Sequence, residues 1–549
     1  METWTQVYDP FNNIWLSAFI ALIPIIFFFL ALTAFRMKGH IAATVTVMLA
    51  IMIAILFYDM PITMVAATTG YGFAFGLWPI SYIVIGAVYL YKLSVKSGQF
   101  DIIRSSIVSI TDDKRIQMLL VAFSFNAFLE GAAGFGAPIA ITAALLVGLG
   151  FEPLKAAGLC LIANTASGAF GAMGIPVIVA GQVSGLAPME IGQFLGTSLP
   201  FISFTIPFLL VVIMDGIKGL KEVWPAALVA GSTYAVTQWA TVTFIGPELP
   251  NITSSIVSLV AIAVFVKTWH PVAQNHSINP EVEAQLAVSL DPEAQLTAGR
   301  ILKAWSPFIA LTAMVTIWSL KPFKNLFIEG GSLEATILHL PVPGLHNLVI
   351  KTAPIVSEPT PYGAMLKLDL LSATGTAIFI AAILSIFILR MSFKTALEAL
   401  VETIKELQKP VLTIMMVLGF AFIANYSGMS STLGLALAAT GGIFPFLSPL
   451  LGWIGVFLTG SVTSNNALFG NLQQITAQQI AVLPMILVAA NTAGGVMAKM
   501  LSPQSIAVAT GAVGLVGREG DLFRFTLKYS FVFLLITGVI TFSQAIFIS

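Results

Sequence analysis

The 36-residue run at positions 116–151 contains a single charged side chain, that of Glu130. A helix needs roughly 20 apolar residues to cross a bilayer core, so this run is long for one crossing and short for two. Three glycines and a proline follow Glu130 at its centre, in the sequence FLEGAAGFGAP. They predict a broken helix or a re-entrant hairpin, which a membrane tolerates only where protein or a water-filled cavity surrounds the backbone. A lone ionisable group at this depth is a candidate functional residue, the alternative being an interfacial loop between two short spans.

Long apolar runs recur from one end of the sequence to the other. Hydrophobic residues make up 57% of the 549 residues and charged residues only 9%, against about 25% charged in soluble domains. The composition therefore predicts a polytopic protein of the lipid bilayer, and a formal net charge of zero argues against a nucleic-acid partner. The single cysteine, Cys160, lies in an apolar run, so we expect no intrachain disulfide and no metal site. No basic n-region precedes the first apolar run, so no signal peptide is expected.

Lysine and arginine residues indicate how the spans are oriented. The first apolar run, at 13–35, is followed at once by Arg36 and Lys38, whereas no lysine or arginine precedes it. The positive-inside rule therefore places the N-terminus outside. We expect about 12–14 membrane segments, the range reflecting the interrupted runs. The stretch at 61–75, rich in glycine and threonine, is expected only to dip into the interface, and 191–214 and 224–245 are expected to be separate spans.

Two parts of the sequence match each other in the same order. Residues 161–180 and 488–507 share an Asn-Thr-Ala-x-Gly core with a proline twelve residues after the asparagine. In chain order the matches are Pro79 with Pro410, 128–131 with 457–460, Asn164 with Asn491 and Pro176 with Pro503, at offsets of 327 to 331. These matches fall in three separate segments, in the same order and at a steady offset, which indicates an internal repeat.

The charges indicate that the two repeats are inverted. The helix from Pro79 runs toward Lys92 and Lys96, whereas the helix from Pro410 begins beside Lys405 and Lys409. Inverted repeats whose broken helices meet at the bilayer midplane are typical of secondary transporters. A Walker-type phosphate loop is absent from the sequence, which argues against ATP as the energy source. Repeated filter sequences and an arginine-rich voltage sensor are absent too, which weakens a channel interpretation.

The predicted fold is an all-α polytopic membrane protein in which two inverted repeats, with broken helices and re-entrant hairpins, form a transport core beside a scaffold. Its parts are N-terminal scaffold helices at 1–77, the first repeat at 78–184, scaffold helices at 185–409, the second repeat at 410–517 and a C-terminal helix at 518–549. The middle scaffold part includes a polar loop at 269–300 and a basic cytoplasmic segment at 390–409.

The repeats bring one charge of each sign into the predicted core, because Lys499 is the only charged residue between positions 410 and 517. Half-helix N-termini and a lysine favour a small carboxylate, and hydroxyl and amide groups can bind a further polar group. The expected substrate-binding residues are Lys499, Asn164, Thr165, Asn491, Thr492, Ser502, Gln504, Gly131, Gly134, Ser461 and Thr463. Glu130 is the expected proton carrier, because burial favours the neutral form of a carboxyl group. The alternatives are a Lys499 that snorkels to the interface and Asn-Thr clusters that only join helices.

Several long segments resemble the bacterial L-lactate permease family over essentially the whole chain. They include KSGQFDIIRSSI from Lys96, FLEGAAGFGAPIAITAALLVGLGF from Phe128, GAMGIPVIVAGQVSG from Gly171, NYSGMSSTLGLALA from Asn425 and SPQSIAVA from Ser502. The resemblance implies proton-coupled uptake of L- and D-lactate and of 2-hydroxy acids such as glycolate across the bacterial inner membrane. It implies an ion-transporter-type fold with a scaffold and a mobile transport part. It also implies no enzymatic activity and no cofactor, the proton being the coupling ion.

The chain differs from the family pattern at one position. The family carries an acidic residue in the tip of the second hairpin, in a GSDTS-like run, where this chain has Val462. Coupling would then rely on Glu130 alone or proceed differently. Sodium-coupled symport and an uncoupled facilitator or channel remain the alternatives, since unwound carbonyls and Asn, Ser and Thr oxygens also suit Na⁺. The sequence leaves a homo-oligomer open.

Overall fold

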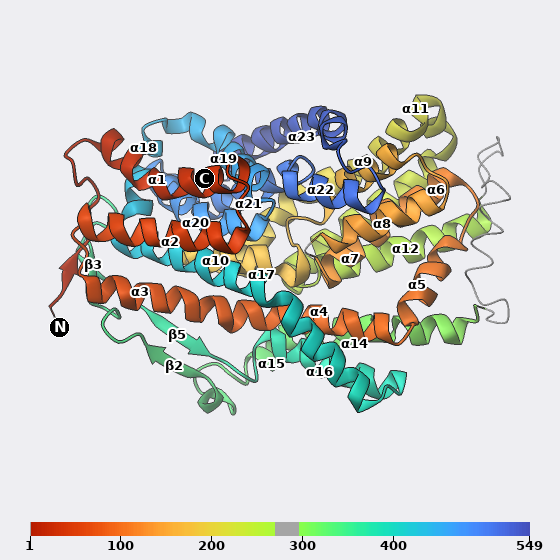
Figure 1. Ribbon diagram of the computed structural model, residues 1–549, viewed down its shortest axis with the longest axis horizontal. Helices are drawn as coiled ribbons and strands as arrows, with labels where there is room; N and C mark the ends of the chain where they lie inside the picture. The colour runs from red at the N-terminus through yellow and green to blue at the C-terminus, as the bar shows by residue number, and fades with distance from the viewer. Residues whose placement is uncertain (1, 135, 270–295, 549) are drawn as a thin grey trace.

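Helices make up most of the computed structural model, which describes residues 2–134, 136–269 and 296–548. Within these residues, ten helical stretches are long and apolar enough to cross a membrane. The N-terminus and β3 lie at one end of the molecule, whereas α5, α6 and the bend of α11 lie at the other (Figure 1). The prediction of a polytopic helical membrane protein is therefore confirmed. Most of the predicted polar loop at 269–300 lies outside the described residues.

The N-terminal helices are α1 (Ile14–Thr33), α2 (Gly39–Leu56), α3 (Ile62–Phe75), η1 (Gly76–Ser81) and α4 (Tyr82–Lys96). The last three form one stretch of 35 residues with a kink at Trp78. The expectation that 61–75 only dips into the interface was therefore wrong, because α3 is the first half of a membrane-length helical stretch. Close packing against residues 393–427 stabilises α3, since a Cβ at Gly72 would lie 2.6 Å from the Cα of Gly419.

The 116–151 run folds into a hairpin, as predicted. After α5 (Gln99–Val108), the chain enters through α6 (Lys114–Met118), η2 (Leu119–Phe125) and α7 (Asn126–Ala132), and returns through α8 (Ala137–Gly148). Both arms pack against each other. Gly134 and Gly136 have positive φ angles of 58° and 88° between α7 and α8, a conformation that glycine adopts without the steric cost of a Cβ. We call this element hairpin 1.

The predicted interruption near Asn164 is also present. Helix α9 (Pro153–Ala163) passes into η3 (Asn164–Ala166), irregular turns and η4 (Ala172–Gly174) before α10 (Ile175–Ser184) begins. Gly171 and Gly174 have positive φ angles in this stretch. The loss of helical hydrogen bonds leaves backbone carbonyls at membrane depth that other groups must satisfy.

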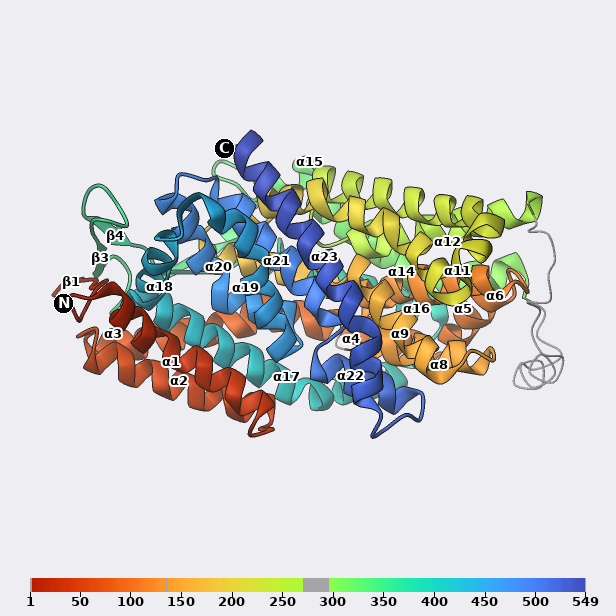
Figure 2. The same cartoon turned by 90° about the horizontal axis from the view of Figure 1, so that it is seen from above.

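Helix α11 (Pro188–Phe244) contains both predicted spans, because it folds back at Gly216, whose φ of 68° breaks the helix. The two arms lie antiparallel, with the Gln193 side-chain amide donating to the Thr243 carbonyl at 3.2 Å. The remaining helices of this part are α12 (Pro250–Thr268), α14 (Ala298–Ser319) and the short α15 (Lys321–Lys324). Figure 2 shows α11 and α12 on the opposite side of the molecule from α1 and α2, with α19 and α21 between them.

A small β part was not predicted. Its strands are β1 (Trp4–Thr5), β2 (Leu338–Pro341), β3 (Val349–Lys351), β4 (Thr360–Tyr362) and β5 (Met365–Leu368), with a 3₁₀ turn η5 (Glu334–Thr336) before β2. β3 pairs in parallel with β1 and antiparallel with β4, while β2 and β5 form a separate antiparallel pair. The N-terminal segment is thereby joined to the region that precedes the second repeat.

The C-terminal part contains α16 (Thr374–Leu389), α17 (Phe393–Ser427), α18 (Met429–Ala438), η6 (Gly441–Ile443), α19 (Phe444–Thr459), α20 (Val462–Gln479), α21 (Pro484–Lys499), α22 (Pro503–Ala512) and α23 (Glu519–Phe547). Helices α19 and α20 form a second hairpin, hairpin 2, with its tip at Gly460 and Ser461. Asn491 lies within the regular helix α21, and the break falls later, between Lys499 and Pro503. The inverted relation of the two repeats stays a prediction.

Candidate functional site

A cavity of about 130 Å³ lies where the two hairpins meet the interrupted segment and helices α17, α21 and α22. We call it the central cavity. Hairpin 1 contributes Glu130 and Gly136, and the tip of hairpin 2 contributes residues from Gly460 to Ser464. Its other lining residues are Gly168, Gly171, Ala172, Ile175, Pro176, Ile414, Lys499, Gln504, Ser505 and Val508. The cavity thus receives backbone and side chains from both predicted repeats.

The two isolated charges of the sequence form an ion pair beside this cavity. The Lys499 Nζ lies 2.5 Å from the Glu130 Oε1, and the side chains are 13% and 4% exposed. Lys499 ends α21, and its stem passes Gly168, where a Cβ would lie 3.3 Å from the Lys499 Cδ. Buried charges are costly unless they are paired and hydrogen-bonded, so each of these groups stabilises the other at membrane depth. The snorkelling alternative for Lys499 does not describe this arrangement.

Asn164 completes the surroundings of the Glu130 carboxylate. Its side-chain amide donates to the second carboxylate oxygen, Oε2, at 3.0 Å and to the Asn126 Oδ1 at 3.3 Å. Asn126 in turn donates to the Cys160 carbonyl at 2.9 Å. Each carboxylate oxygen therefore accepts a hydrogen bond from a different element, which fixes the orientation of the carboxylate toward Lys499.

Side-chain amides of α11 and α12 satisfy the carbonyls that the interrupted segment leaves free. The Asn251 side chain, on α12, donates to the carbonyls of Ser167 and Gly171 at 2.8 Å each. The Gln238 side chain, on α11, donates to the Ala166 carbonyl at 2.9 Å. Sequence reasoning missed both residues, although a buried amide inside an apolar span is the signal that could have found them.

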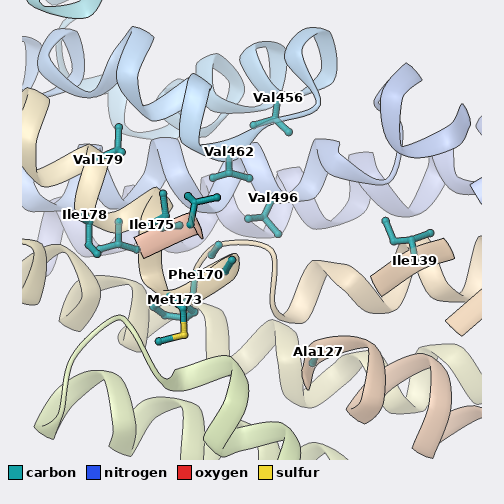
Figure 3. Packing of buried hydrophobic residues seen from close by; sticks show 14 of the residues in the cluster. Ala127, Ile139, Phe170, Met173, Ile175, Ile178, Val179, Val456, Val462 and Val496 are labelled. Atoms are coloured by element: carbon teal, nitrogen blue, oxygen red, sulfur yellow. The ribbon is translucent and has the colours of Figure 1, made fainter. Parts of the chain in front are cut away.

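A polar network joins the two predicted repeats through α20 and Pro176. The Asn466 side chain, on α20, donates to the Pro176 carbonyl at 2.9 Å, and Asn491 donates to the Asn466 Oδ1 at 3.0 Å. Phe170 of the interrupted segment and Ile175 of α10 belong to the same apolar core cluster as Val462 and Val496, which Figure 3 shows. Asn491 therefore contacts the other repeat through Asn466 and does not line the cavity.

Of the predicted site residues, Glu130, Lys499, Ser461, Thr463 and Gln504 line the cavity. Asn164 contacts Glu130 directly. The others do not line the cavity: Thr165, Asn491, Thr492, Ser502, Gly131 and Gly134. Their burial has local reasons: the Ser502 Oγ caps α22 by accepting from the Ser505 amide at 3.2 Å, and Gly131 permits close contact with α12, where a Cβ would meet Ile252 at 2.8 Å. Gly168, Gly171 and Ile414 also line the cavity, although they were not among the predicted binding residues.

The tip of hairpin 2 is neutral. Val462, where the resemblance led us to expect an acid, is 4% exposed and begins α20. Ser461 caps that helix by accepting from the Ser464 amide at 3.1 Å. Gly460 has a φ of 69°, and a Cβ there would lie 2.6 Å from the Gln504 Oε1, so the side chain of α22 covers the tip. Glu130 is the only carboxylate lining the cavity within the described residues.

Comparison with known proteins decides the family. A family model described as L-lactate permease matches residues 17–548. The chain belongs to the L-lactate permease family. It is 58% identical to the glycolate permease GlcA of Escherichia coli K12 and 58% identical to the L-lactate permease of the same strain, each over 99% of this chain and 98% of the relative. It is 50% identical to the L-lactate permease of Bacillus subtilis strain 168 over 98% of both chains.

Among solved structures, the chain aligns with MtrF of Neisseria gonorrhoeae at a TM-score of 0.46 and 13% identity, covering 88% of this chain and 82% of that one. The family and the ten membrane-length helices confirm a multi-pass protein of the bacterial inner membrane. A permease is a transporter, so the family also supports the expectation that the chain is not an enzyme.

Proposed function

We propose that this protein is a secondary active transporter that takes up lactate, or a related 2-hydroxy monocarboxylate such as glycolate, together with a proton. The relatives that share 58% of its residues are named for L-lactate and for glycolate, and these anions differ by one methyl group. The observation that carries the proposal is the ion pair of Glu130 and Lys499 on the wall of the central cavity. A lysine suits the substrate carboxylate, and Ser461, Thr463 and Gln504 offer hydrogen bonds to the 2-hydroxyl group.

Coupling follows from competition for Lys499. In the empty site, ionised Glu130 and Lys499 neutralise each other at 2.5 Å. A substrate carboxylate that pairs with Lys499 must displace Glu130, which stays uncharged only if it binds a proton. The loaded site, with neutral Glu130 and a carboxylate on Lys499, is again neutral. Sites holding the proton alone or the anion alone carry one unpaired charge, which is costly at membrane depth. One proton therefore accompanies one anion, and transport is electroneutral.

Alternating access of the cavity completes the proposal. Hairpin 1 enters from the end that holds Lys114 and Arg115, and the Glu130 it carries meets the glycine tip of hairpin 2 at the cavity. Glycines with positive φ at both tips, Gly136 and Gly460, allow the backbone to approach the ligand closely. Motion of the hairpins relative to the scaffold would open the cavity to either side in turn.

The test is uptake of radiolabelled lactate into proteoliposomes with an imposed pH gradient, acid outside. We expect accumulation above the external concentration, its collapse with a protonophore, competition by glycolate, and no change when valinomycin and K⁺ clamp the membrane potential. Equilibration without accumulation would instead identify an uncoupled facilitator and overturn the proposal. Accumulation that responds to the clamped potential would contradict the one-to-one stoichiometry.

Sodium coupling is the second candidate, and buried oxygens near the site favour it. Within the described residues, the Asn164 Oδ1 and the Thr165 Oγ1 are buried and have no hydrogen-bond partner. Side-chain oxygens at a broken helix are the groups with which transporters bind Na⁺. Lactate uptake at fixed pH with sodium replaced by choline separates the candidates, because the proton mechanism predicts unchanged uptake and the sodium mechanism predicts its loss.

A further inference from the structure

A second cavity, of about 110 Å³, lies between the β part and the helices α17 and α20. We call it the outer cavity. Its lining includes Lys351 and Tyr362 from strands β3 and β4, Ser431 from α18, and Asn471, Gln474 and Gln478 from one face of α20. The site holds one cation and several neutral polar side chains, and no carboxylate lines it among the described residues. This composition differs from the central cavity, where the lysine has a carboxylate partner.

Lys351 is a cation without a fixed counter-charge. Its Nζ lies 3.6 Å from the centroid of the Tyr362 ring, and no ion pair involves it within the described residues. The Tyr362 ring is itself fixed, since it stacks on Tyr426 at 4.2 Å between centroids. Burial without a carboxylate partner lowers the pKa of Lys351 from its ordinary value. An anion seated beside the ammonium group would offset this desolvation and stabilise the charged form.

The polar side chains of the outer cavity differ in their availability. The Asn425 amide donates to the Val183 carbonyl at 2.9 Å and its oxygen accepts from Ser430 at 2.8 Å, so this side chain is occupied. Asn471 and Gln474, one turn apart on α20, have no recorded side-chain hydrogen bond in the described part of the chain, and both line the cavity. Their amides can donate to a ligand that Lys351 holds by its charge.

The same two helices, α17 and α20, line both the outer and the central cavity. Helix α17 contributes Ile414 to the central cavity and Asn425 to the outer one. Helix α20 contributes Val462 at one end and Gln474 toward the other. At 1.5 Å per residue, both separations correspond to roughly 16–18 Å along the helix. The outer cavity lies beside the β part and the N-terminal strand, which the positive-inside rule places on the outer face.

We propose that the outer cavity is an antechamber that binds a small carboxylate anion on the outer face before the anion reaches the central cavity. Lys351 provides the positive charge, Tyr362 orients it, and the amides of Asn471 and Gln474 bind the remaining polar atoms. The proposal rests on the proposed function for the identity of the anion, but the binding site itself does not require proton coupling. A single positive group at the mouth of a pathway raises the local concentration of an anionic substrate.

The test uses thiol labelling, since the only native cysteine, Cys160, is 0% exposed. Gln478 lines the outer cavity and is exposed. The Gln478→Cys variant in right-side-out membrane vesicles is treated with two membrane-impermeant methanethiosulfonate reagents, one anionic and one cationic. We expect the anionic reagent to react at least about 5-fold faster than the cationic one. We expect millimolar lactate to slow the reaction relative to sodium chloride of equal ionic strength. Unsubstituted protein gives the background.

Two further variants assign the effect to Lys351. Lys351→Gln in the Gln478→Cys background should remove both the charge preference and the protection by lactate. Lys367→Gln, which removes another lysine of the β part that is paired with Asp369 at 3.2 Å, should leave both unchanged. Equal rates for the two reagents, or no protection by lactate, would overturn the antechamber. The protection measurement keeps Lys351 intact, so it decides the question even if Lys351→Gln fails to fold. If the protein shows no pH-driven lactate uptake in proteoliposomes but lactate still protects Gln478→Cys from labelling, the proposed proton coupling is refuted and the antechamber is not.

Discussion

Arg115 is a fully buried cation and Lys499 is 13% exposed, and their surroundings differ in a way that bears on the role proposed for Lys499. Arg115 is 0% exposed and contacts three carboxylates, Asp113 at 2.8 Å, Asp215 at 3.2 Å and Glu222 at 2.6 Å. Lys499 contacts a single carboxylate and borders the central cavity. A cation with an excess of fixed acids has no need of a ligand, whereas a cation with one acid can exchange that acid for a substrate.

The carboxylates that pair with Arg115 also differ in position from the one that pairs with Lys499. Around Arg115 the carboxylates join the start of hairpin 1 to the bend of α11, so that the scaffold holds the hairpin at its base. Around Lys499 the carboxylate belongs to the same hairpin near its tip, where the chain is broken by glycines. We infer that hairpin 1 is anchored at its base and carries an exchangeable charge at its tip. The predictions below test this division, beginning with the largest expected effect.

Glu130→Gln should abolish net uptake driven by a pH gradient and spare exchange of internal for external lactate. Glutamine resembles the protonated carboxyl, so substrate still pairs with Lys499, but the empty carrier would hold an unpaired ammonium group and could not return. Radiolabelled uptake and counterflow in proteoliposomes measure the two activities. Full pH-driven uptake in this variant would show that Glu130 carries no coupled proton.

Lys499→Ala should raise the apparent KM for lactate by roughly 10-fold or more, the effect of losing a charge-assisted hydrogen bond to a carboxylate. Lys499→Arg keeps the charge and is the matched control, with a smaller increase expected because the guanidinium is wider. Initial rates over a range of lactate concentrations, normalised to the protein in the membrane, measure the change. An unchanged KM in Lys499→Ala would place the substrate carboxylate elsewhere.

Part of this difference between the base and the tip of hairpin 1 could be predicted from the sequence. Glu130 and Lys499 stand out because each is the only charge in a long apolar run, and Gly134 and Gly136 mark the break because few other residues adopt a positive φ. Their pairing could not be predicted, since it joins positions 369 apart in sequence and depends on how the two repeats dock. Asn491 illustrates the same limit: its sequence matches Asn164, but its helix stays regular.

The scaffold contacts were equally hidden. Asn251 and Gln238 donate to carbonyls that exist as free groups only because the segment after Asn164 is unwound, so their role appears only when the packing is known. The β part was missed because its strands are only two to four residues long and carry no clear alternation. Short strands depend on their pairing partners, which lie far away in the sequence.

Arg115→Met should have the smallest effect on substrate affinity and a clear effect on stability. Removing the cation leaves three carboxylates facing each other without compensation, and breaking such a buried group costs about 3–5 kcal/mol when it is fully buried. The acids here are 13–28% exposed, so water reduces that cost.

For Arg115→Met we expect a lower Tm in detergent and less protein in the membrane. The KM of the remaining transporter should be unchanged within about 2-fold, because Arg115 does not line the central cavity. Asp113→Asn, which leaves two acids on Arg115, should lower the Tm less. A several-fold rise in KM in Arg115→Met would show that the base of hairpin 1 takes part in substrate binding, and the contrast between the two cations would no longer separate structure from function.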